Sequence, residues 1–454
     1  MIWIIVLSAT LLVPVEVWGE ESLKPAELVL SVAEGEVLTL EQAVARALRD
    51  NRPVKNAAIE VDKSQERVSA AKTLRWPALT FSLLESRLLT PLDFEFKTGV
   101  FGTFPATGPI PGQDTKIRTE PRFHTFIVGN VTQPLSQLYR IGLGIEQLDV
   151  AREITREELR SKRQSAVDDV KRAYYGLIQS QSALEAAEES IKYLRELDRV
   201  TTDYVSQQVI LKFESLEVKA RLARAEYQVL TLRNTLASQK ERLNNLLGRD
   251  IRTDFRVAEV PEAAPYEADP VAASARALKQ RPEVNAARLH IKQAEYDLRI
   301  KKAQYIPDLS LAFNYLSPVN IEVVPQNIMT VGLQLSWDVY DWGRKAREMA
   351  ERRKAIEQAN NQFREAEPRV VMDVNNSLRE LQETRELIRS SQLAREAAQE
   401  KVRVTLNKYA QHAALLKDTL EAQAALADAN RQYQLALSSF WTARADFDKA
   451  LGEE

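Results

Sequence analysis

The chain has 454 residues, a formal net charge of −2, 28% charged residues and no cysteine. The balanced charge gives no electrostatic case for binding nucleic acid, and the lack of cysteine excludes disulfides, thiolate zinc sites and a lipid-anchored cysteine. The three histidines lie far apart without metal-ligand spacing, so neither a metal site nor a cofactor is expected. Glycine is scarce, with 14 residues, which favours long helices.

The N-terminus resembles a secretion signal. Residues 2–13 form an apolar run of suitable length, and Gly19 offers a small residue for cleavage. A membrane anchor is the alternative, but the run is shorter than the ~20 residues of a spanning helix. No later segment reaches about 18 consecutive apolar residues, the lower limit for such a helix. Any membrane insertion downstream would therefore require strands.

The next part of the chain predicts two helices and then two strands. Thr39 and Gln42 can form a capping box at the first helix, and Pro53 suits the first turn of the second, which ends near Pro77. Two segments then alternate apolar and polar residues, as half-buried strands do: 79–83 and, more weakly, 123–133. Residues 90–121 are rich in proline and glycine, which predicts a long loop.

Long helices follow, and the whole scheme then restarts. Residues 143–203 and 212–247 predict a helical hairpin that stops at Gly248. After a linker, the second set comprises a helix over 281–305, strands over 309–315 and 329–337, and a hairpin of 345–408 with 413–451. Pro368 should kink the third of the long helices.

The two halves repeat at a fixed offset of 204 residues. Adding 204 to one apolar seam predicts the other: Val167, Val170, Tyr174, Leu177 and Leu184 become Val371, Val374, Leu378, Leu381 and Ile388. Two unrelated amphipathic helices are the alternative, but so many coincident positions favour duplication. The predicted domains are a signal peptide (1–19), a first repeat (20–249), a linker and equatorial region (250–278) and a second repeat (279–454).

Two strands per half cannot close a barrel, and lipid does not tolerate an open sheet edge. If the strands enter a membrane, several chains must therefore pool them.

With these parts in place, the chain resembles the TolC family of outer-membrane efflux proteins. The resemblance rests on the opening helix at Leu38–Leu48, on the segment Trp337–Gly343 after the last strand, and on Tyr409 followed by Leu416–Ala422. It implies a mainly α fold with a membrane β-barrel, in which long helical hairpins form a barrel of their own. Each protomer of a homotrimer would contribute four strands to a twelve-stranded barrel in lipid.

The resemblance also implies a location and partners. The chain would lie in the outer membrane of a Gram-negative bacterium, with a large periplasmic portion that includes an equatorial region. A periplasmic adaptor and an inner-membrane pump would complete the tripartite system, which exports drugs, metals or proteins.

Acidic residues at the helical tips are the first candidate site. Asp418 and Glu421 share one helical face, and Glu214 and Glu217 hold the same places in the first copy. The family places acidic rings at the tunnel mouth, where stacked carboxylates would attract cations and hold protons more tightly. The alternative is a solvated helix face, since most carboxylates are exposed.

Tyrosines at the tips are the second candidate. Tyr204 and Tyr409 match a family tyrosine that holds the mouth closed, although packing between helices is the equal alternative. Gln207 and His412 stand where the family often has glycine, and Ala414 stands at the place of its gating arginine. We assign these four positions of the two tips to gating or adaptor contact: Tyr204, Tyr409, Gln207 and His412.

The predicted strands distinguish between the competing functional hypotheses. An apolar stripe is predicted to face lipid, the core of a soluble sheet being its alternative: Phe81, Leu311, Phe313, Leu333, Leu335 and Trp337. Trp76 and Trp337 could belong to interfacial aromatic belts. A periplasmic coiled-coil scaffold without a pore has no use for such strands. The duplicated hairpins and the lack of a β-rich C-terminal half argue against an adaptor. An enzyme is not expected, because no GxSxG, HExxH or phosphate-binding glycine-rich motif occurs.

Overall fold

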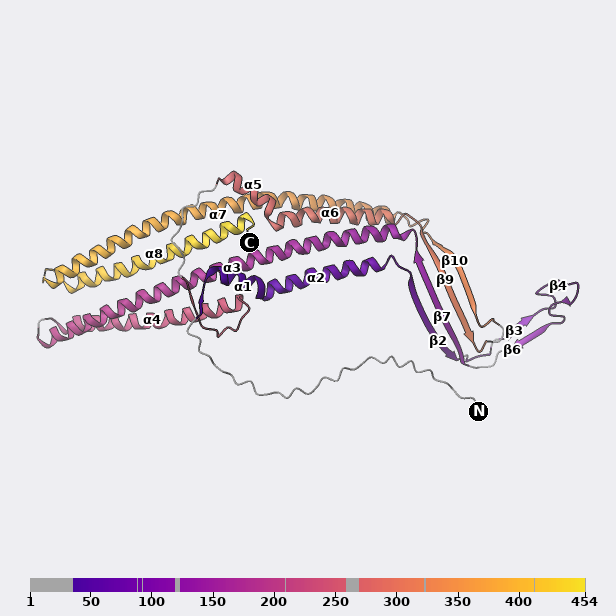
Figure 1. Cartoon of the computed structure of the whole chain (residues 1–454), viewed down its shortest axis with the longest axis horizontal. Coiled ribbons are helices and arrows are strands. Elements are labelled where there is room, and N and C mark those ends of the chain that lie inside the picture. The colour runs from indigo at the N-terminus through magenta and orange to yellow at the C-terminus, as the bar shows by residue number, and fades with distance from the viewer. Residues whose placement is uncertain are drawn as a thin grey trace, which may run out of the picture.

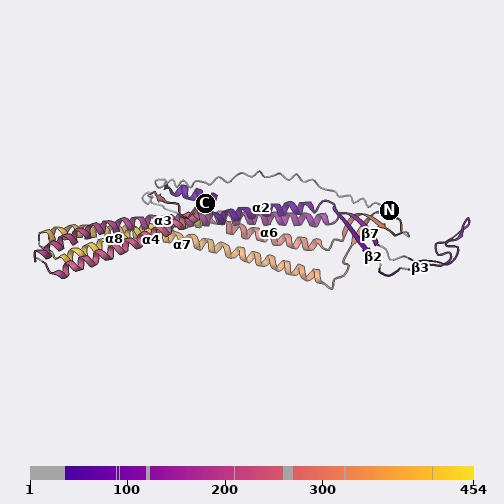
Figure 2. The same ribbon diagram turned by 90° about the horizontal axis from the view of Figure 1, so that it is seen from below.

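The computed structural model describes residues 36–87, 89–91, 93–118, 123–208, 210–258, 269–321, 324–411 and 413–453. The molecule is elongated, with long helices over most of its length and a sheet at one end (Figures 1 and 2). Within these ranges, no helix combines the length and apolarity needed to cross a membrane. The predicted signal peptide lies outside the described residues.

The first half begins with a short strand and two helices. Its elements are β1 (Glu36–Leu38), α1 (Leu40–Asp50), α2 (Arg52–Thr73), β2 (Ala78–Arg87), β7 (Phe123–Pro134), α3 (Gln137–Ser206) and α4 (Lys212–Leu246). The predicted capping box is confirmed, since the Thr39 hydroxyl accepts from the Gln42 amide at 3.3 Å and the Gln42 side chain accepts from the Thr39 amide at 3.1 Å. Asn51 caps α2 with a single bond, in which its side-chain oxygen accepts from the Val54 amide.

The second half repeats this order. Its elements are β8 (Phe255–Val257), α5 (Pro270–Gln280), α6 (Pro282–Ala303), β9 (Asp308–Val319), β10 (Ile328–Ser336), α7 (Arg344–Ala410) and α8 (Leu416–Leu451). The predicted duplicated, mainly α architecture is confirmed. The connection expected at 250–278 contains β8 and most of α5, and β8 pairs in parallel with β1. Pro368 lies inside α7, which continues on both sides of it.

The long loop predicted at 90–121 is wrong in part. It contains two small antiparallel pairs, β3 (Asp93–Phe96) with β6 (Thr115–Arg118) and β4 (Thr103–Phe104) with β5 (Gly108–Pro109). The segment is rich in proline and glycine, but most of these residues lie at its turns and bends, and Gly108 with Pro109 forms β5 itself. Phe94 and Phe96 lie on one face of β3 with their rings stacked at 6.5 Å, an alternation too short to recognise in the sequence.

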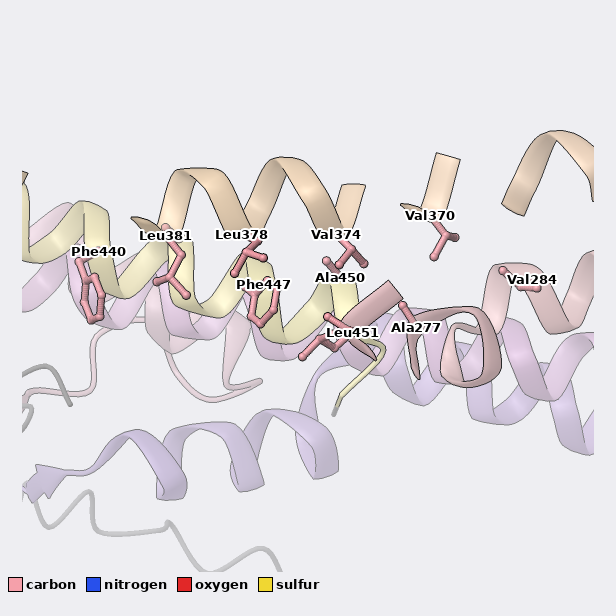
Figure 3. Packing of buried hydrophobic residues seen from close by; sticks show 12 residues of the cluster. Ala277, Val284, Val370, Val374, Leu378, Leu381, Phe440, Phe447, Ala450 and Leu451 are labelled. Carbon is pink, nitrogen blue, oxygen red and sulfur yellow. The ribbon is translucent and has the colours of Figure 1, made fainter. Parts of the chain in front are cut away.

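Each half has its own core, and the two cores correspond. In the first, Val170, Tyr174 and Leu177 of α3 pack against Leu243 and Leu247 at the end of α4. Figure 3 shows the second, where α7 meets the end of α8 through the equivalent residues: Val374, Leu378, Leu381, Phe447 and Leu451. The repeat is inexact at its start. Val371 is only half-buried, and Val370 takes the buried place.

A glycine follows the second helix of each hairpin and packs against a helix junction in the same half of the chain. Gly248 after α4 and Gly452 after α8 have φ values of +70° and +85°, the left-handed conformation that glycine adopts freely. Gly248 lies against the junction between α1 and α2, and Gly452 lies against the junction between α5 and α6. The Asn51 side chain strengthens the first closure by donating to the Leu246 carbonyl at 2.8 Å.

Ion pairs join the two halves between α3 and α8. The Asp168 carboxylate is 5% exposed and holds Arg172 at 3.2 Å and Lys449 at 3.0 Å. Tyr175 stacks on Trp441 with ring centroids 5.7 Å apart, and burial raises the pKa of Tyr175 to about 12. These contacts fix α3 and α8 side by side, so the two hairpins form one layer.

Tyr174 ties α3 to the small parallel sheet. Its buried hydroxyl lies 2.8 Å from the Leu38 carbonyl oxygen and 3.0 Å from the Ala258 carbonyl oxygen, at the ends of β1 and β8 respectively. Each half contributes one of these strands, so this hydroxyl also connects the halves.

Candidate functional site

The sheet at one end of the molecule has the strand order β10-β9-β7-β2 and is antiparallel throughout. The two inner strands come from different halves, and the two outer strands leave their edges unpaired within the described part of the chain. Residues that pair across strands share a face of the sheet. The register therefore assigns every side chain in the sheet to one of two faces.

One face is apolar across all four strands. Its large aliphatic, methionine and phenylalanine side chains are Leu79, Phe81, Leu83, Ile127, Val131, Leu309, Leu311, Phe313, Met329, Val331, Leu333 and Leu335, and Gly129, Gln133, Tyr315 and Ser317 lie among them. Much of it is exposed in the single chain, with Leu79 at 76% and Phe81 at 73%. Monomeric soluble proteins rarely leave so large an apolar patch open.

The opposite face is mainly polar. Thr80, Asn130, Asn314 and Thr330 lie in one row across it, and Gln334 pairs with Ser310 two rows away. The row on the other side combines Ser82 with three apolar residues: Val128, Leu316 and Ile328. The alternation predicted for these strands thus separates an apolar from a polar surface. Five residues of the predicted stripe lie in the strands on the apolar face, and Trp337 directly follows β10.

The helical tips lie at the far end of the molecule (Figure 1). In the first tip, α3 ends at Ser206 and α4 starts after Leu211; in the second, α8 starts after Leu415. Gln208 adopts a positive φ of 60° in the first turn. Both tips are therefore tight connections between antiparallel helices.

The four candidate carboxylates lie in the first two turns of α4 and α8. Asp418 accepts a hydrogen bond from the Leu415 amide at 3.1 Å, so it caps the helix as well as carrying charge. Glu214 is half-buried at the matching position. Cations on the same helices face the other two: Arg221 lies 2.9 Å from Glu217, and Lys417 lies 3.8 Å from Glu421.

The tip tyrosines take part in packing between the hairpins. Tyr409 of α7 is half-buried against a small apolar cluster of Leu197, Val218 and Leu420. Burial raises the pKa of Tyr409, and Tyr204 and Glu214 raise it further because they lie nearby. Both candidate tyrosines and one candidate carboxylate therefore meet in one place.

Two residues at this place were not expected from the sequence. The Tyr193 hydroxyl and the Thr419 hydroxyl are buried without a hydrogen-bond partner among the described residues. Thr419 stands between two candidate carboxylates in the sequence, which is the only signal that could have revealed it. Gln207 is exposed at the C-cap of α3, and His412 lies outside the described residues.

A family comparison identifies the kind of protein that carries this sheet and these tips. The model of the outer membrane efflux protein family matches residues 43–249 and 273–453. The chain belongs to this family. The two matched segments cover both halves, so the whole described architecture is that of an outer-membrane efflux protein. No curated protein sequence matches the chain significantly.

Solved channel structures share the fold at low sequence identity. The chain is similar to the CmeC outer membrane channel of Campylobacter jejuni, with a TM-score of 0.75, 14% identity and coverage of 91% of this chain and 85% of that one. It is also similar to VceC of Vibrio cholerae, with a TM-score of 0.70, 16% identity and coverage of 91% of this chain and 96% of that one. The open state of the MtrE channel of Neisseria gonorrhoeae is similar with a TM-score of 0.70, 15% identity and coverage of 91% of this chain and 89% of that one.

Proposed function

We propose that three copies of this chain form the outer-membrane exit duct of a tripartite efflux or secretion system. The observation that carries the proposal is the four-stranded sheet, which has one apolar face and two unpaired edges at the end of long helical hairpins. A soluble scaffold would gain nothing from exposing that face. Lipid would cover it, because burying apolar surface in hydrocarbon is favourable.

The unpaired edges support a ring of copies. Unpaired strand edges in lipid leave backbone groups without hydrogen bonds, at a cost of several kcal/mol for each group. Pairing β2 of one copy with β10 of the next keeps the antiparallel order, because the sheet has an even number of strands. Three copies give twelve strands. β2 has 10 residues and β10 has 9, the length that crosses a bilayer when tilted.

The helices support a tunnel on the periplasmic side. α3 alone has 70 residues, which corresponds to about 105 Å at 1.5 Å per residue. Such a length reaches far beyond the membrane towards a periplasmic adaptor and an inner-membrane pump, the partners that the family resemblance implies. No catalytic or cofactor role is proposed for the chain.

The tips would form the mouth of the tunnel. Threefold symmetry would turn Asp418, Glu421, Glu214 and Glu217 into stacked acidic rings that favour cations. Arg221 and Lys417 would offset part of that charge, because each lies against one of the carboxylates. Tyr204 and Tyr409, with Gln207 and His412, would form the contacts that close the mouth or receive the adaptor.

Disulfide cross-linking tests the ring, because the native chain has no cysteine. We would combine Ser82→Cys on β2 with a cysteine at Thr330, Gln334 or Ser336 on β10, one pair at a time. Within one chain, β2 and β10 are three strand spacings apart, roughly 14 Å, and a disulfide cannot bridge that distance. Any bond must therefore join different copies.

The expected product is a species that stops at three copies in outer-membrane fractions. The Ser82→Cys single variant serves as the control and should give no such product. Failure of every pair to cross-link, a ladder beyond three copies, or a soluble monomer would overturn the proposal.

A further inference from the structure

Four junctions between helices and strands lie at one level along the molecule. α2 and α6 end there, α3 and α7 begin there, and the sheet starts on the other side (Figures 1 and 2). We define the collar as the four segments that make these junctions: 72–78, 134–141, 299–308 and 337–348. These segments come from all four helices that meet the sheet.

The collar is strongly basic in an otherwise balanced chain. It holds nine Lys and Arg against four Asp and Glu, whereas the whole chain has a net charge of −2. All four carboxylates already have partners within the collar: Asp308 with Arg140 at 3.2 Å, Asp338 with Lys345 at 3.6 Å, Glu348 with Lys301 at 2.6 Å, and Asp341 with the backbone amides of Gly343 and Lys345.

Four exposed cations of the collar have neither a carboxylate nor an aromatic ring as a partner among the described residues: Lys72, Arg75, Lys302 and Arg347. They come from three of the four junctions, so the positive charge is spread around the molecule. An anionic partner outside the chain would complement them, and nothing within the collar competes for them.

Aromatic side chains accompany these cations. The described part of the chain has four tryptophans, and three of them are exposed in the collar: Trp76 at 74%, Trp337 at 54% and Trp342 at 80%. Exposed tyrosines stand beside them at Tyr139, Tyr305 and Tyr340. The other end of the sheet has no tryptophan among the described residues. Tryptophan and tyrosine concentrate at the headgroup level of membranes, where an apolar ring meets a polar layer.

We propose that the collar binds the anionic headgroups of phospholipids in the membrane leaflet nearest the helices, and so fixes the depth of the protein in the bilayer. The inference rests on the proposed membrane-spanning trimer. Charge complementarity and the broad distribution of the cations over three junctions favour a lipid surface over a protein partner. The aromatic rings would lie at the boundary with the acyl chains, next to the apolar face of the sheet.

The collar variant Lys72→Gln, Arg75→Gln, Lys302→Gln and Arg347→Gln removes the four unpaired cations. A matched control replaces four exposed cations that also lack carboxylate partners among the described residues but lie near the tips: Lys212→Gln, Lys219→Gln, Arg224→Gln and Lys408→Gln. Both variants change the net charge equally, so they differ only in where the charge is lost.

Full-length protein in mild detergent would be titrated with short-chain phosphatidylglycerol or phosphatidylcholine. Tryptophan fluorescence is the readout, because three of the six tryptophans lie at the site, Trp441 is packed between helices, and the other two, Trp3 and Trp18, fall in the predicted signal peptide. Each Lys or Arg near an anionic surface contributes about fivefold in affinity. With salt screening, we expect the native protein to prefer phosphatidylglycerol at least roughly tenfold. The collar variant should lose that preference, and the tip variant should keep it.

Equal affinity of the native protein for the two lipids would overturn the inference, as would an equal loss of preference in both variants. Cross-linking between β2 and β10 is measured on the same preparations. A lipid-indifferent protein that still cross-links as a trimer refutes the collar alone, whereas the loss of the trimer refutes the proposed duct.

Discussion

The glycines that close the two halves provide the sharpest test of the internal packing. Gly248 and Gly452 are repeat-equivalent and both have positive φ, but their surroundings differ. A Cβ at Gly248 would lie 2.3 Å from the Asp50 carbonyl oxygen, whereas a Cβ at Gly452 would lie 3.1 Å from its nearest neighbours at the Gln280–Arg281 junction. The same substitution should therefore have unequal costs.

The two costs can be estimated from separate contributions. The left-handed conformation costs an alanine about 1–2 kcal/mol at either site. At Gly248, the backbone of Asp50 must also move by almost an ångström, and such overpacking adds about 1–3 kcal/mol. We expect Gly248→Ala to lower the free energy of unfolding by about 2–5 kcal/mol per chain, and Gly452→Ala by about 1–2 kcal/mol.

Denaturant unfolding of the full-length protein, followed by circular dichroism at the helical band, measures both variants. Gly142→Ala is the control, because Gly142 lies inside α3 and a Cβ added there would meet nothing within 4 Å; it should be stabilising by about 0.5–1 kcal/mol. Equal costs at Gly248 and Gly452 would refute the reasoning, since the close approach of Asp50 could then not be present.

Further predictions concern the contacts between the halves and the tips. Tyr174→Phe should lower the free energy of unfolding by about 1–3 kcal/mol, because the Ala258 carbonyl loses its buried donor while the Leu38 carbonyl keeps the Ala258 amide; a neutral effect would contradict the connection between α3 and the β1–β8 pair. Asp168→Asn should lower the free energy of unfolding by about 2 kcal/mol. This is below the range for fully buried ion pairs, because both cations that contact Asp168 are partly exposed. Asp168→Glu, which keeps the carboxylate, is the control. Burial raises the pKa of Asp446, so its contribution to stability is present below its ordinary pKa of 3.8 and is lost as the pH rises through the raised value. Asp446→Asn should remove that pH dependence. If the stability of the variant changes with pH as that of the native protein does, Asp446 is not its source. Replacing Asp418 and Glu421 together by alanine should lower cation selectivity in planar-bilayer recordings, whereas unchanged selectivity would remove them from the pore.

The regular elements could be predicted from the sequence because their periods are long and unbroken. Alternation over Leu309–Tyr315 and three-and-four spacing along Val170–Leu177 persist long enough to identify strands and helices. The small strands between β2 and β7 escaped because two to four residues cannot establish a period. The predicted apolar seam was wrong at Val371, because valines occupy both 370 and 371 and only packing decides which of them faces the core.

The candidate site was predictable in position but not in detail. The acidic residues at the tips follow from the repeat, and the ion pair between Glu217 and Arg221 follows from a spacing of four on one helix. The meeting of Tyr204, Tyr409 and Glu214 depends on how two hairpins pack together, and periodicity within one helix carries no such information. The exact pairing of β7 with β9 likewise joins residues almost two hundred positions apart.

The order of elements within one copy determines how copies can join. In the sheet, the inner strands β7 and β9 come from different halves, and β2 and β10 are left at the edges. The helices follow the same rule: α3 contacts α6 and α8, whereas α2 and α4 contact α3 from one side and α7 borders α6 and α8 on the other. Every layer thus ends in a first-half element on one edge and in a second-half element on the other.

Unlike edges cannot form a twofold interface, in which the same surface meets itself. They suit a head-to-tail contact, in which the first-half edge of one copy meets the second-half edge of the next. Such a contact must either close into a ring or continue into a filament. Closure would satisfy the backbone groups of β2 and β10 at the same time as it joins α4 to α7, so strand pairing in the membrane and helix packing outside it would select the same number of copies.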